Sequence, residues 1–219
     1  MSRRRLVAFD ASPPADCQAC ARLARFRAVN RVAFPDWRNA PVESFGESDA
    51  RLLIVGLAPG LSGANRTGRP FTGDYAGDLL YATLLEFGFA AGVYDRRPDD
   101  GLALSDCAIV NAVRCAPPEN KPTPAEIAAC RPYLARAIGA LPRLEAILAL
   151  GRIAHDSVLR VLGLRLARFA FAHGARHDLD GTGVVLFDSY HCSRYNTNTG
   201  VLTAPMFHAV FAAVRARLA

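Results

Sequence analysis

The sequence has no long hydrophobic run. Its 219 residues are 51% hydrophobic and 21% charged, yet its longest apolar stretches, such as residues 144–150, have only the length of a strand. A membrane-spanning helix needs roughly 18 or more consecutive apolar residues, so we expect no membrane partner. The basic N-terminus lacks the apolar segment and the small-residue cleavage site of a secretory signal. We therefore predict a cytoplasmic protein, and the composition excludes a disordered or fibrous chain.

Lysine is almost missing as well. The chain has 26 basic against 20 acidic residues, a formal net charge of +6, and Lys121 is its single lysine. The planar guanidinium of arginine can bind a phosphate through two hydrogen bonds, as lysine cannot. The positive excess weakly favours a nucleic acid or another polyanion as partner. A GC-rich genome produces the same preference for arginine, so the composition alone does not decide between these interpretations.

The chain shows no internal repeat, low-complexity tract or interdomain linker, and its length suits one domain. Short apolar runs alternate with segments of helical periodicity. We expect strands at residues 51–55, 108–113, 144–150 and 184–189, and helices at residues 22–33, 75–87, 123–140, 152–162 and 203–218. This alternation predicts an α/β fold with a parallel sheet and helices on both faces. Ligands then bind beyond the carboxyl ends of the strands.

A glycine-rich segment, residues 56–74, directly follows the first expected strand. It holds five glycines and two prolines, so its backbone can approach a ligand closely. It matches neither the phosphate-binding loop of nucleotide hydrolases nor the glycine fingerprint of dinucleotide-binding folds, which excludes both classes. Arg66 and Arg69 flank the segment as phosphate-binding candidates. Taken alone, the segment also suits a long solvated loop.

The sequence contains six cysteines. Disulfides are not expected in a cytoplasmic chain with a core of this size. Cys17 and Cys20 are spaced so that one turn supplies two thiolates, and two more come from Cys115 and Cys130. Four thiolates suit zinc or an iron–sulfur cluster, and the lack of a second tight pair favours the cluster. The second pair also suits buried small hydrophobic residues, which is our interpretation of the other two, Cys107 and Cys192.

A histidine-containing segment, residues 191–197, follows the last expected strand. His191 is therefore well placed to point into a cleft. A neutral imidazole can donate a hydrogen bond to a developing oxyanion without changing its own charge. His155 and His208 lie on expected helices, where a satisfied structural or surface histidine is the more common case.

Together these segments resemble the uracil-DNA glycosylase superfamily, and most closely its family-5 (type b) branch. The resemblance covers nearly the whole chain. The matching segments are CQACARL at 17–23, GLAPG at 56–60, NRTGRPFTGD at 65–74, NAVRCAPPENKPTP at 111–124 and HCSRYNT at 191–197. Two positions depart from the wider superfamily. Classical members carry a polar side chain there that positions water, and this chain has Leu57 and Ala58 instead. The alanine is itself a mark of the type-b branch. Cys192 stands where proline or another apolar residue is usual.

The resemblance implies a three-layer α/β/α sandwich around a central four-stranded parallel sheet. It implies one domain over residues 1–219, with an N-terminal cluster-binding extension over about residues 1–40. It also implies a [4Fe–4S] cluster held by Cys17, Cys20, Cys115 and Cys130. The implied activity is hydrolysis of the N-glycosidic bond of uracil in DNA, which starts base excision repair. Members of the branch also accept other deaminated bases such as hypoxanthine and xanthine. We expect a monomer acting on DNA.

The resemblance and the chemistry together assign candidate site residues. The candidate catalytic residues are Asp74, Asn120 and His191. The candidate substrate-binding residues are Gly56, Leu57, Ala58, Pro59, Gly60, Phe71 and Asn111. The candidate DNA-binding residues are Arg66, Arg69, Ser193, Arg194 and Asn196. In this hypothesis the base is flipped out of the helix, Phe71 stacks on it, and His191 stabilises the departing anion.

Several of these residues have a structural alternative. Phe71 also suits the core, Asp74 also suits a cap of the helix that starts at residue 75, and Asn120 also suits a turn. Two further functional classes stay open: a member of the superfamily that recognises damage without excision, and one that forms a covalent adduct with the abasic sugar. An iron–sulfur protein without DNA binding leaves the glycine-rich and histidine segments unexplained.

Overall fold

The structure is a computed structural model that describes residues 12–219. The first part of the expected N-terminal extension, residues 1–11, lies outside the described residues. Within residues 12–219, no helix is both long enough and apolar enough to cross a membrane.

Four parallel strands form the centre of the sheet, and each lies where an apolar run predicts it. They are β2 (Leu52–Gly56), β5 (Cys107–Asn111), β6 (Ala146–Leu150) and β8 (Val185–Ser189), arranged in the order β5-β2-β6-β8. All their residues are buried, which explains the continuous apolar runs in place of an alternating pattern. In register, Ile54 lies between Ile109 and Leu148. The parallel sheet of the α/β prediction is confirmed.

Within residues 12–219 the sheet has six strands, however, and not four. β1 (Phe45–Gly46) pairs antiparallel with β5 at one edge, and β7 (Arg176–Asp178) pairs antiparallel with β8 at the other. These edge strands are two and three residues long, too short to give a periodic hydrophobic signal. Short edge strands also limit pairing with other chains. The four-strand expectation therefore describes the centre of the sheet alone.

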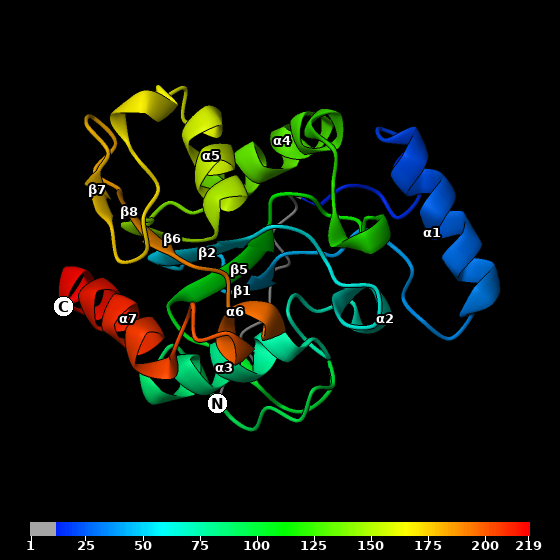
Figure 1. Cartoon of the computed structure of the whole chain (residues 1–219), viewed down its shortest axis with the longest axis horizontal. Helices are drawn as coiled ribbons and strands as arrows, with labels where there is room; N and C mark the ends of the chain where they lie inside the picture. Colours follow the sequence, from blue (N-terminus) through cyan, green and yellow to red (C-terminus); the bar gives the residue numbers. More distant parts are fainter. Residues whose placement is uncertain (1–11) are drawn as a thin grey trace.

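Helices cover both faces of the sheet (Figure 1). One face carries α4 (Pro124–Gly139) and α5 (Arg152–Val161), and the other carries α3 (Tyr75–Glu86) and α7 (Ala204–Leu218). Each face has its own buried hydrophobic core, so the molecule is the expected three-layer sandwich. The short elements are α2 (Ala64–Thr67), β3 (Ala90–Ala91), β4 (Ala103–Leu104), the 3-10 turns Pro118–Asn120 and Leu166–Arg168, and α6 (Arg194–Asn198).

Helix α1 (Ala21–Ala33) lies at one end of the molecule, away from α7 (Figure 1). It is joined to the start of α4 by an ion pair in which Arg22 donates to both carboxylate oxygens of Glu126 at 2.7 Å. Glu126 also completes the predicted capping box, because its side chain accepts from the Thr123 backbone N–H while the Thr123 hydroxyl accepts from the Glu126 N–H. The Glu126 carboxylate therefore caps the start of α4 and also binds α1 to it.

Candidate active site

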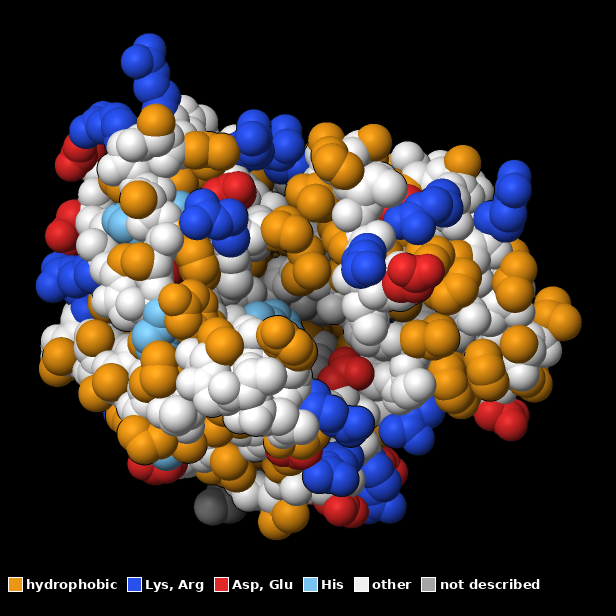
Figure 2. Space-filling model, viewed as in Figure 1, with side chains coloured by type: hydrophobic (Ala, Val, Ile, Leu, Met, Phe, Trp, Pro, Cys, Tyr) orange, Lys and Arg blue, Asp and Glu red, His pale blue; other side chains and the backbone are white. Residues whose placement is uncertain are grey.

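A cavity of about 470 Å³ opens where three of the central strands end. Its walls come from the segments after β2, β5 and β8, as the topology of a parallel sheet predicts. This volume is in the range of small-ligand sites. Figure 2 shows the hollow on this face of the molecule. The lining residues are Leu57, Ala58, Gly60, Phe71, Asp74, Tyr75, Ala76, Asn111, Asn120, His191, Ser193, Arg194 and Tyr195.

The carboxylate of Asp74 reaches this cavity from the residue that precedes α3. It stands at the N-cap position of that helix, yet its side chain forms no capping hydrogen bond. It turns instead toward Gly60 and Gly63, where any Cβ would overlap the carboxylate, and accepts a long hydrogen bond from the backbone N–H of Ala64 at 3.4 Å. Burial raises the pKa of Asp74, although nearby backbone N–H groups and Arg66 act in the opposite direction. The capping alternative is therefore wrong for the side chain.

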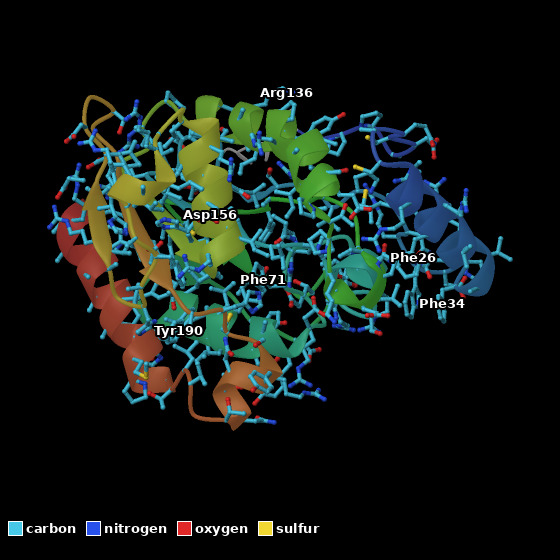
Figure 3. All side chains as sticks on the ribbon, turned by 45° about the horizontal axis from the view of Figure 1, so that its top comes forward. Phe26, Phe34, Phe71, Arg136, Asp156 and Tyr190 are labelled. Atoms are coloured by element: carbon cyan, nitrogen blue, oxygen red, sulfur yellow. The ribbon has the colours of Figure 1, made fainter. Side chains whose placement is uncertain are left out.

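Phe71 and His191 form one wall of the cavity. Their rings lie nearly parallel, with centroids 5.9 Å apart and an angle of 29° between the planes. Figure 3 shows Phe71 near the middle of the molecule, whereas Phe34 lies at its edge. Burial lowers the pKa of His191 to about 4, so the imidazole is neutral at physiological pH. Phe71 is 6% exposed, so it packs in the core and lines the cavity at once.

Two asparagines line the cavity, one at the end of β5 and one in the segment that follows this strand. Asn111 ends the strand, and its Oδ1 is buried with no hydrogen-bond partner among residues 12–219. A buried acceptor without a partner costs free energy, which makes this oxygen a candidate for binding a ligand N–H. Asn120 lies in a turn with a positive φ of 57° beside Glu119 at 55°. The turn alternative for Asn120 therefore holds together with its place in the cavity.

Five predicted residues lie outside the cavity lining. Gly56 and Pro59 are buried behind it. Arg66 is exposed and donates to the Ser62 carbonyl at 2.8 Å. Asn196 is half-buried, and its side-chain amide donates to the carbonyl of His191 at 2.8 Å, which holds the histidine segment in place. The fifth residue is Arg69.

The expectation that Arg69 contacts DNA is wrong. Its guanidinium is 5% exposed and donates two hydrogen bonds to the carboxylate of Asp100, at 2.9 and 2.7 Å. The pair holds the pKa of Asp100 well below its usual range. A buried cation needs such a partner to offset its lost hydration. Arg69 is therefore part of the structure behind the cavity.

Three lining residues are not among the site residues named from the sequence. Ala76 and Tyr75 belong to the first turn of α3, and Tyr195 lies on α6 with 74% of its surface exposed. The guanidinium of Arg194 lies 5.1 Å from the ring of Tyr75, which connects α6 to α3 across the opening. Among residues 12–219, neither Arg66 nor Arg194 forms an ion pair, so both guanidinium groups are available to an anion. The sequence does contain a signal for Tyr195. It is an aromatic residue among polar neighbours in the segment that begins with His191, just after a strand.

The four cysteines of the predicted metal site line one small cavity between α1, α4 and the segment after β5. Two N–H groups point at their sulfur atoms: the backbone N–H of Arg114 donates to Cys130 Sγ at 3.3 Å and Arg27 donates to Cys115 Sγ at 3.4 Å. N–H groups directed at sulfur are typical of iron–sulfur proteins. Burial raises the pKa of Cys130 to about 12, so this thiol is protonated unless a metal group binds it. Four sulfur atoms around one cavity, two of which accept hydrogen bonds from N–H groups, fit a thiolate-ligated metal group. Cys107 and Cys192 are buried in the main core instead.

A second polar cluster, formed by residues of α5, β7 and β8, does not belong to the cavity lining. Asp188 accepts from His155 Nδ1 at 2.8 Å and from His177 Nε2 at 3.0 Å, while His155 Nε2 donates to the Phe169 carbonyl at 2.9 Å. Burial favours a lower pKa for His155, but the contact with Asp188 outweighs it and raises the pKa. Both ring nitrogens of His155 and both carboxylate oxygens of Asp188 have hydrogen-bond partners. The expectation that His155 is a satisfied structural histidine is confirmed.

Comparison with known proteins agrees with this geometry. The family model described as the uracil DNA glycosylase superfamily matches residues 43–215, most of the chain and all three segments that line the cavity. The chain belongs to the uracil DNA glycosylase superfamily.

Individual relatives narrow this similarity to one branch. The chain is 47% identical over 197 residues to a type-5 uracil-DNA glycosylase of Thermus thermophilus, an alignment covering 87% of this chain and 89% of the relative. It is 38% identical over 192 residues to a type-5 uracil-DNA glycosylase of Pyrobaculum aerophilum, covering 86% and 83%. A type-4 uracil-DNA glycosylase of the same archaeon is 35% identical over 158 residues, covering 71% and 72%. The resemblance to the type-5 branch is confirmed.

Proposed function

We propose that the protein is a DNA glycosylase that removes uracil from DNA by hydrolysis of its N-glycosidic bond and so starts base excision repair. The observation that carries the proposal is the single cavity into which a neutral imidazole, a buried carboxylate, a carboxamide with a free acceptor and an aromatic ring all project. The names of its type-5 relatives support the same substrate.

The base has to leave the helix before it can enter the cavity. Flipping a nucleotide costs a few kcal/mol, and contacts with phosphates offset this cost. Arg194 and Ser193 line the cavity, and in the part of the chain that the structure describes neither Arg66 nor Arg194 forms an ion pair, so both guanidinium groups are candidates for binding DNA phosphates. Tyr195, exposed on α6, is placed to occupy the space that the flipped base leaves in the stack.

Inside the cavity the base edge meets Asn111. Uracil offers one N–H donor between two carbonyl acceptors, and a carboxamide offers the complementary acceptor and donor. Uracil N3–H satisfies the partnerless Oδ1 of Asn111, while the amide nitrogen donates to an adjacent carbonyl. Phe71 stacks on the face of the base.

Bond cleavage leaves the electron pair of the C1′–N1 bond on uracil and a positive charge on the sugar. The neutral imidazole of His191 donates a hydrogen bond to the uracil oxygen on which negative charge develops. Asp74 and Asn120 orient a water molecule toward C1′, and the Asp74 carboxylate stabilises the positive charge there. The water oxygen bonds to C1′ and releases one proton, which gives free uracil and an abasic site.

The cavity also favours a second group of substrates. Its volume of about 470 Å³ exceeds what one pyrimidine ring fills, and Ala58 adds little bulk to its lining. We therefore include the bicyclic deaminated bases hypoxanthine and xanthine in the proposal.

Cleavage of labelled oligonucleotides tests both parts. We expect excision from strands that contain uracil, slower excision of hypoxanthine and xanthine, and none of thymine or cytosine. A substrate that is bound but never cut identifies a member that only recognises damage. A protein–DNA product that survives denaturation identifies covalent-adduct chemistry. Either result contradicts the hydrolytic mechanism.

For the four-cysteine cavity we propose a [4Fe–4S] cluster held by Cys17, Cys20, Cys115 and Cys130. When bound, such a cluster would cross-link the segment just before α1, helix α4 and the segment after β5. Cys17 and Cys20 are partly exposed while Cys130 is buried, so the cluster fixes an outer segment onto the body of the protein. The expected monomeric state and cytoplasmic location stay predictions.

Cys130→Ser is expected to remove the iron and to lower the melting temperature, since loss of a bound metal group removes its contribution to folding. Iron analysis and visible absorbance of anaerobically purified protein measure the first effect, and thermal unfolding measures the second. Cys107→Ser is the matched control, because it changes an equally buried cysteine outside the cavity. Zinc in place of iron in the unaltered protein contradicts the cluster.

A further inference from the structure

Phe71 has a backbone conformation that aromatic residues rarely adopt. Its φ is +58°, in the left-handed region where a Cβ crowds the following carbonyl. Such strain persists where the surrounding structure imposes it, and it concentrates at functional sites. What holds Phe71 in this conformation is therefore part of how the cavity works.

Two tyrosines, the buried Tyr81 and the half-buried Tyr94, contact the backbone at this point. The hydroxyl of Tyr81 donates to the Pro70 carbonyl at 2.6 Å, and the hydroxyl of Tyr94 donates to the Phe71 carbonyl at 3.4 Å. Partial burial raises the pKa of Tyr94 to about 12, and full burial raises that of Tyr81 further still. The hydroxyls therefore stay protonated and act as donors.

Helix α3 leaves room for the Phe71 carbonyl because it has a glycine at this point. Gly77 of α3 lies so close that a Cβ at this position would overlap the Phe71 oxygen and come within 2.6 Å of the Tyr94 hydroxyl. A side chain there would displace either group. The close approach of α3, together with the two hydroxyls, encloses the carbonyl groups of Pro70 and Phe71.

Arg69 orients the two tyrosine rings. Its guanidinium lies 5.4 Å from the centre of the Tyr81 ring and 5.9 Å from that of Tyr94, while the rings lie 4.5 Å from each other. Its Nε donates to the Thr72 hydroxyl at 2.6 Å, and its terminal nitrogens are held by Asp100. The residues on both sides of Phe71 are thus fixed to one buried cation.

We propose that Tyr81 and Tyr94, oriented by the buried Arg69–Asp100 pair, are positioning residues that hold Phe71 in its left-handed conformation and thereby set the ring face against which the flipped base stacks. They touch neither base nor sugar. This inference rests on the stacking role given to Phe71 in the proposed function.

A double-mutant cycle with two readouts tests the inference. The variants are Tyr94→Phe and Tyr81→Phe, each made with phenylalanine or alanine at position 71. Removing a hydroxyl is expected to lower the melting temperature equally in both backgrounds, because the backbone carbonyl loses its donor in each. With Phe71 present, it is also expected to slow single-turnover uracil excision by up to about 10²-fold, the cost of a misplacement of about 1 Å. With alanine at position 71, the hydroxyl should make no difference to the rate.

The control is Ile147→Val, which removes one methyl group from the hydrophobic core on the other face of the sheet. Its loss of stability should be comparable to that caused by removing a tyrosine hydroxyl. We expect it to keep the full excision rate. Equal slowing by this control, or an equal rate loss in both backgrounds, would mean that general loosening explains the effect and overturns the inference. If Phe71→Ala excises uracil at the unaltered rate, Phe71 does not act by stacking on the base. That outcome needs only the single variant, so it is distinct from failure of the positioning role.

Discussion

His191→Ala is expected to slow single-turnover excision of uracil by about 10²–10³-fold, the usual cost of removing one donor to a developing oxyanion. The fold should survive, because the ring stacks against Phe71 at the cavity wall and not within either hydrophobic core. The amide of glutamine can still donate one neutral hydrogen bond, so His191→Gln should retain more activity than the alanine variant. Rates within about twofold of the unaltered protein contradict the assignment.

The matched control is His208→Ala. His208 lies on α7, 3.4 Å from Glu86 and outside the cavity, so its loss should leave the excision rate unchanged. The two variants together separate the loss of any histidine from the loss of this one.

The pH dependence tests the charge state of the same ring. Burial lowers the pKa of His191 from 6.5 to about 4, so the imidazole carries no charge from about pH 5 upward. The excision rate should therefore show no inflection near 6.5. An inflection there that disappears in His191→Gln would mean that the charged imidazolium takes part in the reaction.

The sequence predicted the structure best where a pattern of residues has a single physical explanation. Continuous apolar runs predicted the four central strands because both faces of a parallel sheet are buried. The three loops of the site followed from the rule that parallel strands end at one edge. The edge strands β1 and β7 were missed because strands of two or three residues carry no pattern.

The error at Arg69 has a different cause. An arginine in a glycine-rich loop suits a phosphate site, and nothing local shows that Asp100, thirty-one positions later, lies against it. Contacts of this kind depend on the folded chain. For the same reason the sequence placed Phe71 and Asp74 in the site but left their structural alternatives open. The structure shows a strained core ring that lines the cavity and a carboxylate that has turned away from its helix.

Asp74→Asn is expected to slow excision by about 10²–10⁴-fold, the range for a residue that assists proton removal from water. The amide has the same shape, so it keeps the fit against Gly60 and Gly63 but loses the negative charge that stabilises the sugar and accepts a proton. Single-turnover rates with a uracil-containing duplex measure the effect. Asp78→Asn is the matched control, since Asp78 lies on α3, the helix that Asp74 precedes, and pairs with Arg96 at the surface.

The pH dependence of Asp74 has a definite sign. Burial raises its pKa above 3.8, so the excision rate should fall as the pH drops through the raised value and the carboxylate becomes protonated. Stability should change in the opposite sense. The folded protein disfavours the ionised form, so the free energy of unfolding falls as the pH rises from the ordinary pKa through the raised one, and this cost is absent at lower pH.

Asp74→Asn has no such cost at any pH. Its melting temperature, compared with that of the unaltered protein, should therefore be relatively highest at neutral pH and lose this advantage in acid. Thermal unfolding at a series of pH values measures the difference. Suppose that Asp74→Asn loses activity and that its stability relative to the unaltered protein is greatest at neutral pH. The charge of Asp74 then serves the reaction and destabilises the folded protein. The reverse dependence would mean that the carboxylate is stabilised by its surroundings and serves the structure.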